Sequence, residues 1–156
     1  MINAMIDQPG PGRISLSRGI GKPEASTPVH ALSGKRVVVV EDEGITQLQL
    51  QKILRSAGAE IVGAARDGRE AVSIVLRERP DIVLMDVQMP VMNGLDAAEQ
   101  ILRAMPVCIA MLTANSDQDS VQRAACIGAA GYIIKPVTAA TLLPQLAAAF
   151  AQYNSR

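Results

Sequence analysis

Short apolar runs alternate along the chain with stretches in which apolar side chains recur every three or four residues. The valines at 37–40 and the apolar residues at 82–85 have no polar break, which is typical of strands buried on both faces of a parallel sheet. The three-and-four spacing predicts amphipathic helices between such strands. The predicted strands cover residues 35–40, 60–65, 82–85, 107–112 and 129–134, and the predicted helices cover 44–57, 68–79, 94–105, 117–127 and a last region around 143–150.

Breaking and capping residues set the ends of these helices. Asp67 is the predicted N-cap of the helix at 68–79, and Pro80 ends that helix. Gly58 and Gly128 end two other helices. Pro144 fits the last helix only if it lies in the first turn, where a missing N–H costs nothing. The predicted inward faces are Leu50, Ile53, Leu54 and Ala57; then Ala71, Val72, Val75 and Leu76; then Leu95, Ala98, Leu102 and Met105; then Val121, Ala124 and Ala125; and finally Leu143, Leu146, Ala147 and Phe150.

This alternation predicts an α/β fold, a doubly wound parallel sheet with right-handed crossovers and helices on both faces. The fourth helix offers only a small apolar face, which indicates that it is loosely seated. Residues 1–34 are rich in proline, glycine and serine and show no sustained period, so we expect a disordered N-terminal tail before a folded domain at residues 35–154.

Composition excludes several functional classes. The chain is 49% hydrophobic but has one Phe, two Tyr and no Trp, so its core must be aliphatic. Lysine plus arginine number 15 and aspartate plus glutamate 15, which leaves no basic field for direct binding of nucleic acid. No apolar run reaches the roughly 18 residues of a membrane span, and we expect a cytoplasmic protein. Cys108 and Cys126 lack metal or redox spacing and are predicted to be buried thiols.

Chemically active residues follow the predicted strands where each strand ends. Glu41 and Asp42 follow the first strand, Asp86 the third, Thr113 the fourth and Lys135 the fifth. The carboxyl ends of parallel strands meet at one edge of a sheet, where such folds bind ligands. Hard oxygen ligands, a carboxylate nucleophile and donors for phosphoryl oxygens together indicate a magnesium-dependent phosphoryl-transfer site. Taken singly, each residue also fits a simpler role, such as capping a helix or facing solvent.

Four segments also resemble those of a known family. VVVVEDE, MDVQMPVMNG, LTAN and GYIIKP are similar to the signature segments of the receiver domains of two-component response regulators, over residues 35–154. The resemblance implies a flavodoxin-like, CheY-like sheet of strand order 2-1-3-4-5, a magnesium ion and phosphorylation on aspartate. In that arrangement Asp86 is the phosphoacceptor and a metal ligand, Asp42 binds Mg²⁺ directly, Glu41 binds it through water, and Gln88 offers its backbone carbonyl.

The same resemblance gives roles to three further residues. Thr113 and Lys135 bind the phosphoryl group, and Thr113 and Tyr132 form the switch that changes the surface of the fourth helix, fifth strand and last helix. For Tyr132, half-buried packing is the alternative. The protein would catalyse its own aspartyl phosphorylation and dephosphorylation while acting mainly as a signalling switch.

The resemblance implies partners but leaves the output open. The phosphoryl donor is a sensor histidine kinase or a histidine phosphotransfer protein, and a downstream protein binds the switch surface; a phosphorylation-dependent homodimer is left open, and no membrane partner is expected. Three outputs stay open: that of a stand-alone receiver, that of a phosphate shuttle, and that of a regulator without its output domain. The last segment, GAAGYIIKPVTAATLLPQLAAAF, also resembles receivers that carry an RNA-binding antiterminator module. A flavodoxin-like small-ligand binder is disfavoured, since no glycine-rich phosphate loop follows a strand.

Overall fold

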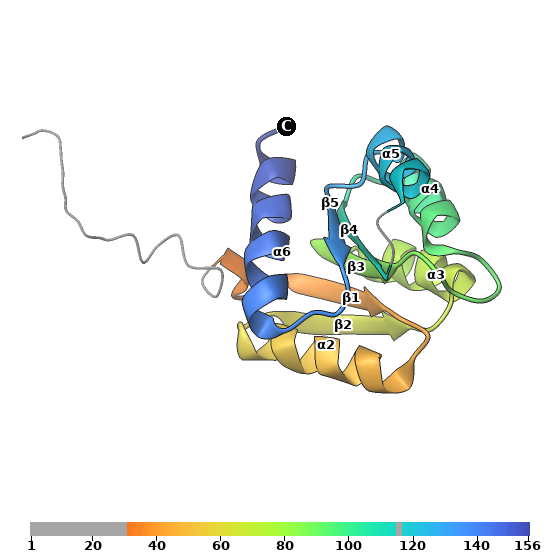
Figure 1. The fold of residues 1–156 in the computed structure, drawn as a ribbon. Helices are drawn as coiled ribbons and strands as arrows, with labels where there is room; N and C mark the ends of the chain where they lie inside the picture. Colours follow the sequence, from red (N-terminus) through yellow and green to blue (C-terminus); the bar gives the residue numbers. More distant parts are fainter. Residues whose placement is uncertain (1–30, 115–116) are drawn as a thin grey trace, which may run out of the picture. The chain divides into compact units, whose positions relative to one another are not determined.

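The structure is a computed structural model and describes residues 31–114 and 117–156. In the unit Leu32–Arg156, five parallel strands form one sheet in the order β2-β1-β3-β4-β5, with a helix after each strand (Figure 1). This confirms the predicted fold class and strand order. The elements are β1 (Arg36–Val40), α2 (Gly44–Ser56), β2 (Glu60–Ala65), α3 (Gly68–Glu78), β3 (Ile82–Asp86), α4 (Gly94–Ala104), β4 (Cys108–Thr113), α5 (Gln118–Ile127), β5 (Gly131–Ile134) and α6 (Ala139–Asn154).

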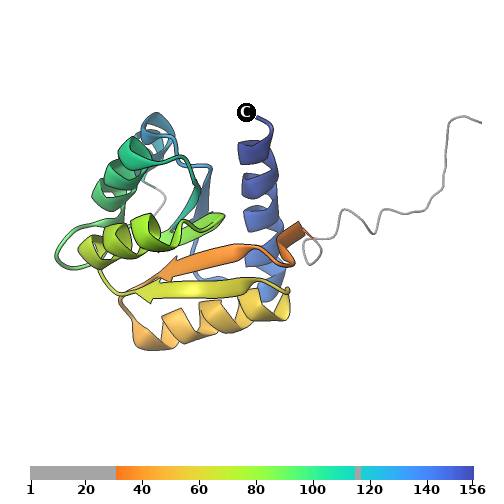
Figure 2. The same cartoon turned by 180° about the vertical axis from the view of Figure 1, so that it is seen from behind.

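Helices cover both faces of the sheet. Helices α2 and α6 lie on one face, and α3, α4 and α5 lie on the other (Figure 2). The valines of β1 pack against both helical layers. Val38 and Val40 pack toward α3 and α4, whereas Val37 and Val39 pack toward α2 and α6. This two-sided burial explains why the strand has no polar position.

Side-chain caps begin most of the helices. Asp67, Asn93 and Asp117 each accept a hydrogen bond from the backbone N–H three residues later, at 2.8, 2.9 and 2.9 Å. Thr138 and Thr141 form a reciprocal capping box at the start of α6. Each such cap stabilises its helix by about 1 kcal/mol, and the predicted cap at Asp67 is confirmed.

The inward face of α3 differs from the prediction. Leu76 is exposed and Ile74 is buried, since the buried face is centred on Ala71 and Val75 and Leu76 lies about 100° further round the helix from Val75. Ile74 fits because the facing β2 residue is Gly63, where an added Cβ would come within 2.6 Å of the Ile74 side chain. A glycine in a strand often marks such a close approach.

Two other helices also correct the sequence pattern. In α5 only Ala124 is buried, while Val121 and Ala125, predicted to face inward, are exposed. In α6, Pro144 lies in the second turn rather than the first, because the helix already begins at Ala139. Burial of leucines on either side of the proline keeps this segment helical despite the missing N–H; the residues buried there are Leu142, Leu143 and Leu146.

Two predictions about solvent exposure meet different outcomes. Cys108 is buried as expected, but Cys126 is exposed, because it lies on the outer side of the thinly packed helix α5. Leu32, placed in the tail by the sequence, packs into the core with β1 and α2, and the remainder of the predicted tail up to residue 30 lies outside the described residues. No described helix combines the length and apolar character that a bilayer crossing requires.

Candidate functional site

Three carboxylates meet at the carboxyl edge of the sheet. Glu41 directly follows β1, and Asp86 ends the neighbouring strand β3, whose Met85 lies opposite Val40. One carboxylate oxygen each from Glu41, Asp42 and Asp86 lies within 4.8 Å of the other two. Glu41 and Asp86 are only 1% and 6% exposed, whereas Asp42 reaches solvent, so the cluster opens to the surface at Asp42.

Lys135 joins this cluster from the edge of the sheet. It directly follows β5, and its backbone N–H donates to the Thr113 carbonyl at 2.7 Å, which extends the pairing of β4 and β5. Its ammonium Nζ donates to Glu41 Oε1 at 2.7 Å and to Asp86 Oδ2 at 2.8 Å. The strand order therefore brings together the acids and the lysine that are 49 and 94 positions apart in sequence.

Burial sets the charge balance of the cluster. Burial raises the pKa of Glu41, and Asp86 acts in the same direction, while hydrogen bonds from Lys135 and the Glu43 N–H oppose the shift only in part. Burial alone would lower the pKa of Lys135, but its hydrogen bonds to Asp86 and Glu41 outweigh burial and raise the pKa. Lys135 thus remains charged at neutral pH, and the Glu41 carboxylate is one that a further cation would stabilise.

Backbone groups fix the two buried carboxylates. Asp86 Oδ1 accepts from the Gln88 N–H at 3.1 Å, and Glu41 Oε2 accepts from the Glu43 N–H at 3.1 Å. The Gln88 side chain itself is exposed. Gly94 lets α4 begin against this loop, since an added Cβ would lie 1.9 Å from the Asp86 carbonyl oxygen. Gly94 therefore has a steric function beside Asp86.

Thr113 and Tyr132 lie on the neighbouring strands β4 and β5, Thr113 at the carboxyl end of its strand and Tyr132 near the start of its strand. Thr113 is the buried last residue of β4, and its β5 partner in register is Ile134. Tyr132 lies opposite Met111 and is half-buried against the apolar cluster beneath α3, α4 and α5. Thr113 thus lies at the carboxyl edge of the sheet, where the acid cluster is, and the Tyr132 side chain lies on the face of the sheet that α5 covers.

Two polar residues at the site were not found from the sequence. Gln47 on α2 donates from its side-chain amide to the Glu41 and Ala65 carbonyls, and Arg66 donates to the Asp42 carbonyl at 3.0 Å. Gln47 belongs to no strand end and no motif, so no local signal singled it out, whereas Arg66 directly follows β2 and its position at that strand end is the signal that could have found it. Glu43 stands at the N-cap of α2 but makes no side-chain cap; its carboxylate instead accepts from the Thr46 hydroxyl at 2.5 Å.

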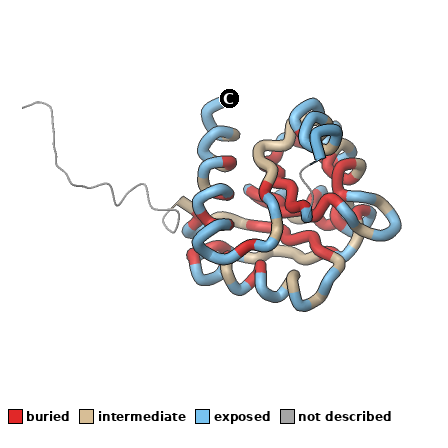
Figure 3. Tube along the Cα trace, viewed as in Figure 1, coloured by how far each residue is buried: buried red, intermediate tan, exposed pale blue. Residues whose placement is uncertain are grey.

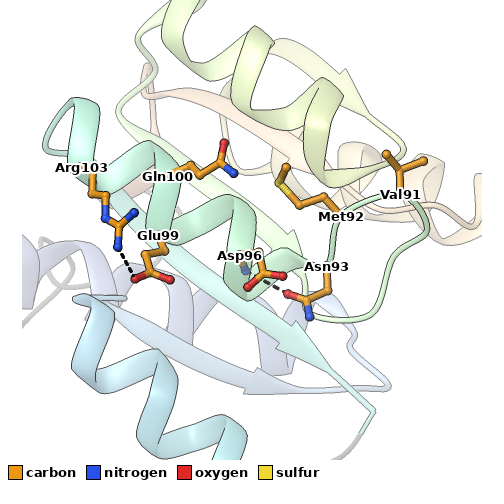
Figure 4. A pocket seen from close by; sticks show the side chains of 7 residues that line it. All are labelled: Val91, Met92, Asn93, Asp96, Glu99, Gln100 and Arg103. Carbon is orange, nitrogen blue, oxygen red and sulfur yellow. Dashed lines mark hydrogen bonds and ion pairs between the residues drawn. The ribbon is translucent and has the colours of Figure 1, made fainter.

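A separate pocket of about 390 Å³ lies between the loop before α4 and the exposed side of α4 (Figure 4). The acid cluster contributes none of the described residues that line it, so the chemistry argued from the sequence does not lie in this hollow. The lining residues are Val91, Met92, Asn93, Asp96, Glu99, Gln100 and Arg103.

Comparisons with known proteins agree with the fold. A family described as the response regulator receiver domain matches residues 37–147. The transcriptional regulatory protein PdtaR of Mycobacterium tuberculosis (strain CDC 1551 / Oshkosh) is 40% identical over 129 residues, which cover 83% of this chain and 63% of PdtaR. The chemotaxis protein CheY of Thermotoga maritima is 41% identical over 104 residues, 66% of this chain and 87% of CheY.

Solved structures show the same architecture. A chain of the CheX-CheY-BeF3-Mg²⁺ complex from Borrelia burgdorferi aligns with a TM-score of 0.73 and 30% identity, covering 76% of this chain and 90% of that chain. The present chain spans less than two thirds of the length of PdtaR. Since the family match covers well over half of the chain and the sheet has the strand order that the resemblance implied, the protein belongs to the response regulator receiver domain family.

Proposed function

We propose that this protein is a phospho-accepting receiver of two-component signal transduction, in which Asp86 takes a phosphoryl group from a histidine kinase or a histidine phosphotransfer protein. One observation carries the proposal: Asp86 is a buried carboxylate at a sheet edge, held by Lys135 at 2.8 Å and flanked by two further acids. Strand-end placement of a nucleophile beside a charged donor suits phosphoryl transfer, which depends mainly on positioning and electrostatics.

The residues at this edge fit a magnesium ion. The donor set is three carboxylates within 4.8 Å of one another, and hard oxygen ligands of this kind favour Mg²⁺ over softer metals. Asp42 and Asp86 would hold the ion directly, Glu41 through water, and Gln88 through its backbone carbonyl. When bound, the ion supplies positive charge that offsets the repulsion between these acids and an incoming phosphoryl group.

The chain's own residues perform the transfer step. A carboxylate oxygen of Asp86 attacks phosphorus in line, so that a new O–P bond forms while the bond from phosphorus to the donor breaks and its electron pair leaves with the donor. The donor leaves as imidazole from phosphohistidine or as acetate from acetyl phosphate. Lys135 and the Thr113 hydroxyl would bind the transferred oxygens, which compensates the negative charge that Asp86 gains.

A protein donor needs a surface on which to dock, and the start of α2 provides one. Ile45 and Leu48 lie one to two turns after the acid cluster and are 80% and 66% exposed. Exposed apolar side chains next to a site are typical of protein interaction surfaces. Phosphorylation of Asp86 would then shift the positions of Thr113 and Tyr132. Their shift would change the surface of α5, β5 and α6, to which a downstream partner would bind.

Intact-mass measurement after treatment with acetyl phosphate and Mg²⁺ tests this function. We expect the wild type to gain one phosphoryl group and Asp86→Asn to gain none, because the amide is not a nucleophile for this reaction. Asp42→Ala should raise the Mg²⁺ concentration needed, whereas Glu43→Ala, which removes an exposed carboxylate outside the cluster, should leave it unchanged. A persistent adduct on Asp86→Asn would place the acceptor elsewhere, and equal losses in the other two variants would contradict the assigned ligands.

A further inference from the structure

The side chain of Gln47 fastens two strand ends together beside the acid cluster. Its amide Nε2 donates to the Glu41 carbonyl at 3.1 Å and to the Ala65 carbonyl at 2.8 Å. Ala65 is the last residue of β2, and its carbonyl also accepts the Glu41 N–H at 3.0 Å. Both hydrogens of one amide group are therefore used to hold the point where β1 and β2 end.

Gln47 is itself held in place from α2. Its backbone N–H donates to the Glu43 carbonyl at 2.9 Å, and its side-chain oxygen accepts from Gln51 Nε2 at 3.5 Å. Gln51 is buried although it is a polar residue on a helix. The amide of Gln47 is half-buried and its donors and acceptor are all engaged, so it has a defined orientation, which makes it suitable for positioning a neighbour.

The carbonyl that Gln47 binds is part of the metal-binding stretch. The Glu41 carbonyl belongs to the planar peptide group that joins Glu41 to Asp42, so the orientation of that plane affects the direction of both side chains. The plane is held by Gln47 at the Glu41 carbonyl, while Arg66 holds the next carbonyl, that of Asp42. Without Gln47 a carbonyl of a residue that is 1% exposed would lose its donor, and the peptide would turn to regain one.

We infer that Gln47 is a positioning residue, which fixes the Glu41–Asp42 peptide so that both carboxylates are preorganised for a divalent cation. This rests on the proposed function, because it assigns Gln47 a task only if the acids bind a cation. Partners that orient metal ligands typically alter metal affinity by about 10- to 100-fold when they are removed. A residue with a purely structural role would alter stability instead.

The test compares Gln47→Met with Gln49→Met by calorimetric titration of Mg²⁺. Methionine has a similar length and no N–H donor, and Gln49 is an exposed glutamine on the same helix. We expect the Mg²⁺ dissociation constant to rise by about tenfold in Gln47→Met and to stay at the wild-type value in Gln49→Met. A Gln47→Met variant that unfolds more readily but binds Mg²⁺ as the wild type does would overturn the inference.

A second measurement on the wild type covers the case in which Gln47→Met does not fold. The side-chain NH₂ resonances of Gln47 should shift during a Mg²⁺ titration, and those of Gln49 should not, because only Gln47 contacts the peptide that carries two ligands. Unmoved Gln47 resonances would contradict the role of Gln47 alone, provided that the backbone resonances of Asp42 and Asp86 respond. If the wild type binds no Mg²⁺, the proposed function and this inference both fail.

Discussion

Helices α4 and α5 lie side by side on the same face of the sheet but are held there by different forces. Five residues of α4 are buried, among them Leu95 and Ile101, whereas α5 buries only Ala124. Figure 3 shows the contrast as a largely exposed α5. Since burial of apolar side chains is the main source of helix stability in proteins, α5 must depend more on other contacts.

Ion pairs supply those contacts. Arg123 of α5 donates to Asp96 and, at 3.3 Å, to Glu99, both on α4, and the hydrogen bond with Asp96 raises the pKa of Arg123. Glu99 also pairs with Arg103 at 2.9 Å within α4. The side chains of Arg123 and Asp96 are 40% and 49% exposed, so water and salt screen the pair. Under the proposed function, phosphorylation of Asp86 has to displace α5, and a helix with few buried contacts is easier to displace.

The largest expected effect is the difference in stability loss between truncating a buried side chain of α4 and truncating an apolar side chain of α5. Ile101→Ala should lower the free energy of unfolding by about 2–5 kcal/mol, because it leaves a cavity at a fully buried site. Val121→Ala on α5 should change it by about 0.5 kcal/mol or less, since Val121 is already 37% exposed. Urea unfolding followed by circular dichroism measures both. Similar losses for the two variants would contradict the difference in anchoring.

The two cysteines extend the comparison to alkaline pH. Burial raises the pKa of the Cys108 thiol from its ordinary 9.0 to about 12. Between these values the unfolded chain has lost the proton and the folded chain keeps it, so stability falls as pH rises, by up to about 1.4 kcal/mol per pH unit. The contribution of the protonated Cys108 thiol to the free energy of unfolding is therefore fully present below pH 9, and it is lost once the pH passes about 12.

The measurement is the free energy of unfolding at several pH values from 8 upward, in the wild type and two variants. Cys108→Ala should remove this part of the alkaline loss, whereas Cys126→Ala, which replaces an exposed thiol on α5, should keep the wild-type slope. If all three proteins have the same slope, the buried thiol is not the cause.

The sequence predicted the sheet well because each strand combines an apolar run with a breaker. Strand β2 was predicted with its observed bounds, and the acids and Lys135 were expected at one edge because parallel strands end together. The faces of the helices were predicted less well: choosing Ile74 over Leu76 as the buried residue of α3 required knowing that Gly63 lies opposite Ile74. Periodicity gives the angle of a face only to within about one residue, or about 100°.

Contacts between distant polar side chains were beyond sequence reasoning altogether. Gln47 on α2 donates to the Ala65 carbonyl of β2, 18 positions away, and Arg123 donates to acids 24 and 27 positions away, so neither pairing leaves a local pattern. Both depend on how two elements are seated on the sheet. The small apolar face of α5 indicated its loose seating, but the residue type that compensates for it could be seen only in the structure.

The smallest expected effect tests that compensation. Arg123→Gln removes the charge that joins α5 to α4, and we expect hydrogen exchange of α5 amides to become about 1.4- to fivefold faster, because exposed ion pairs contribute about 0.2–1 kcal/mol. Amides of α4 should exchange at the wild-type rate, since its buried residues are unchanged. Mass spectrometry of exchanged peptides resolves the two helices.

Arg103→Gln is the matched control. It removes an arginine from the same network, but Arg103 pairs only within α4 in the described structure, with Glu99 four residues earlier, so α5 should keep its protection. Salt distinguishes the mechanisms further: at about 1 M, where the Debye length is about 3 Å, α5 of the wild type should approach the exchange rate of Arg123→Gln, and the variant itself should respond little. If α5 exchanges at one rate in the wild type and in Arg123→Gln at low salt, its anchoring does not depend on Arg123, and the packing of Ala124 is sufficient to hold the helix.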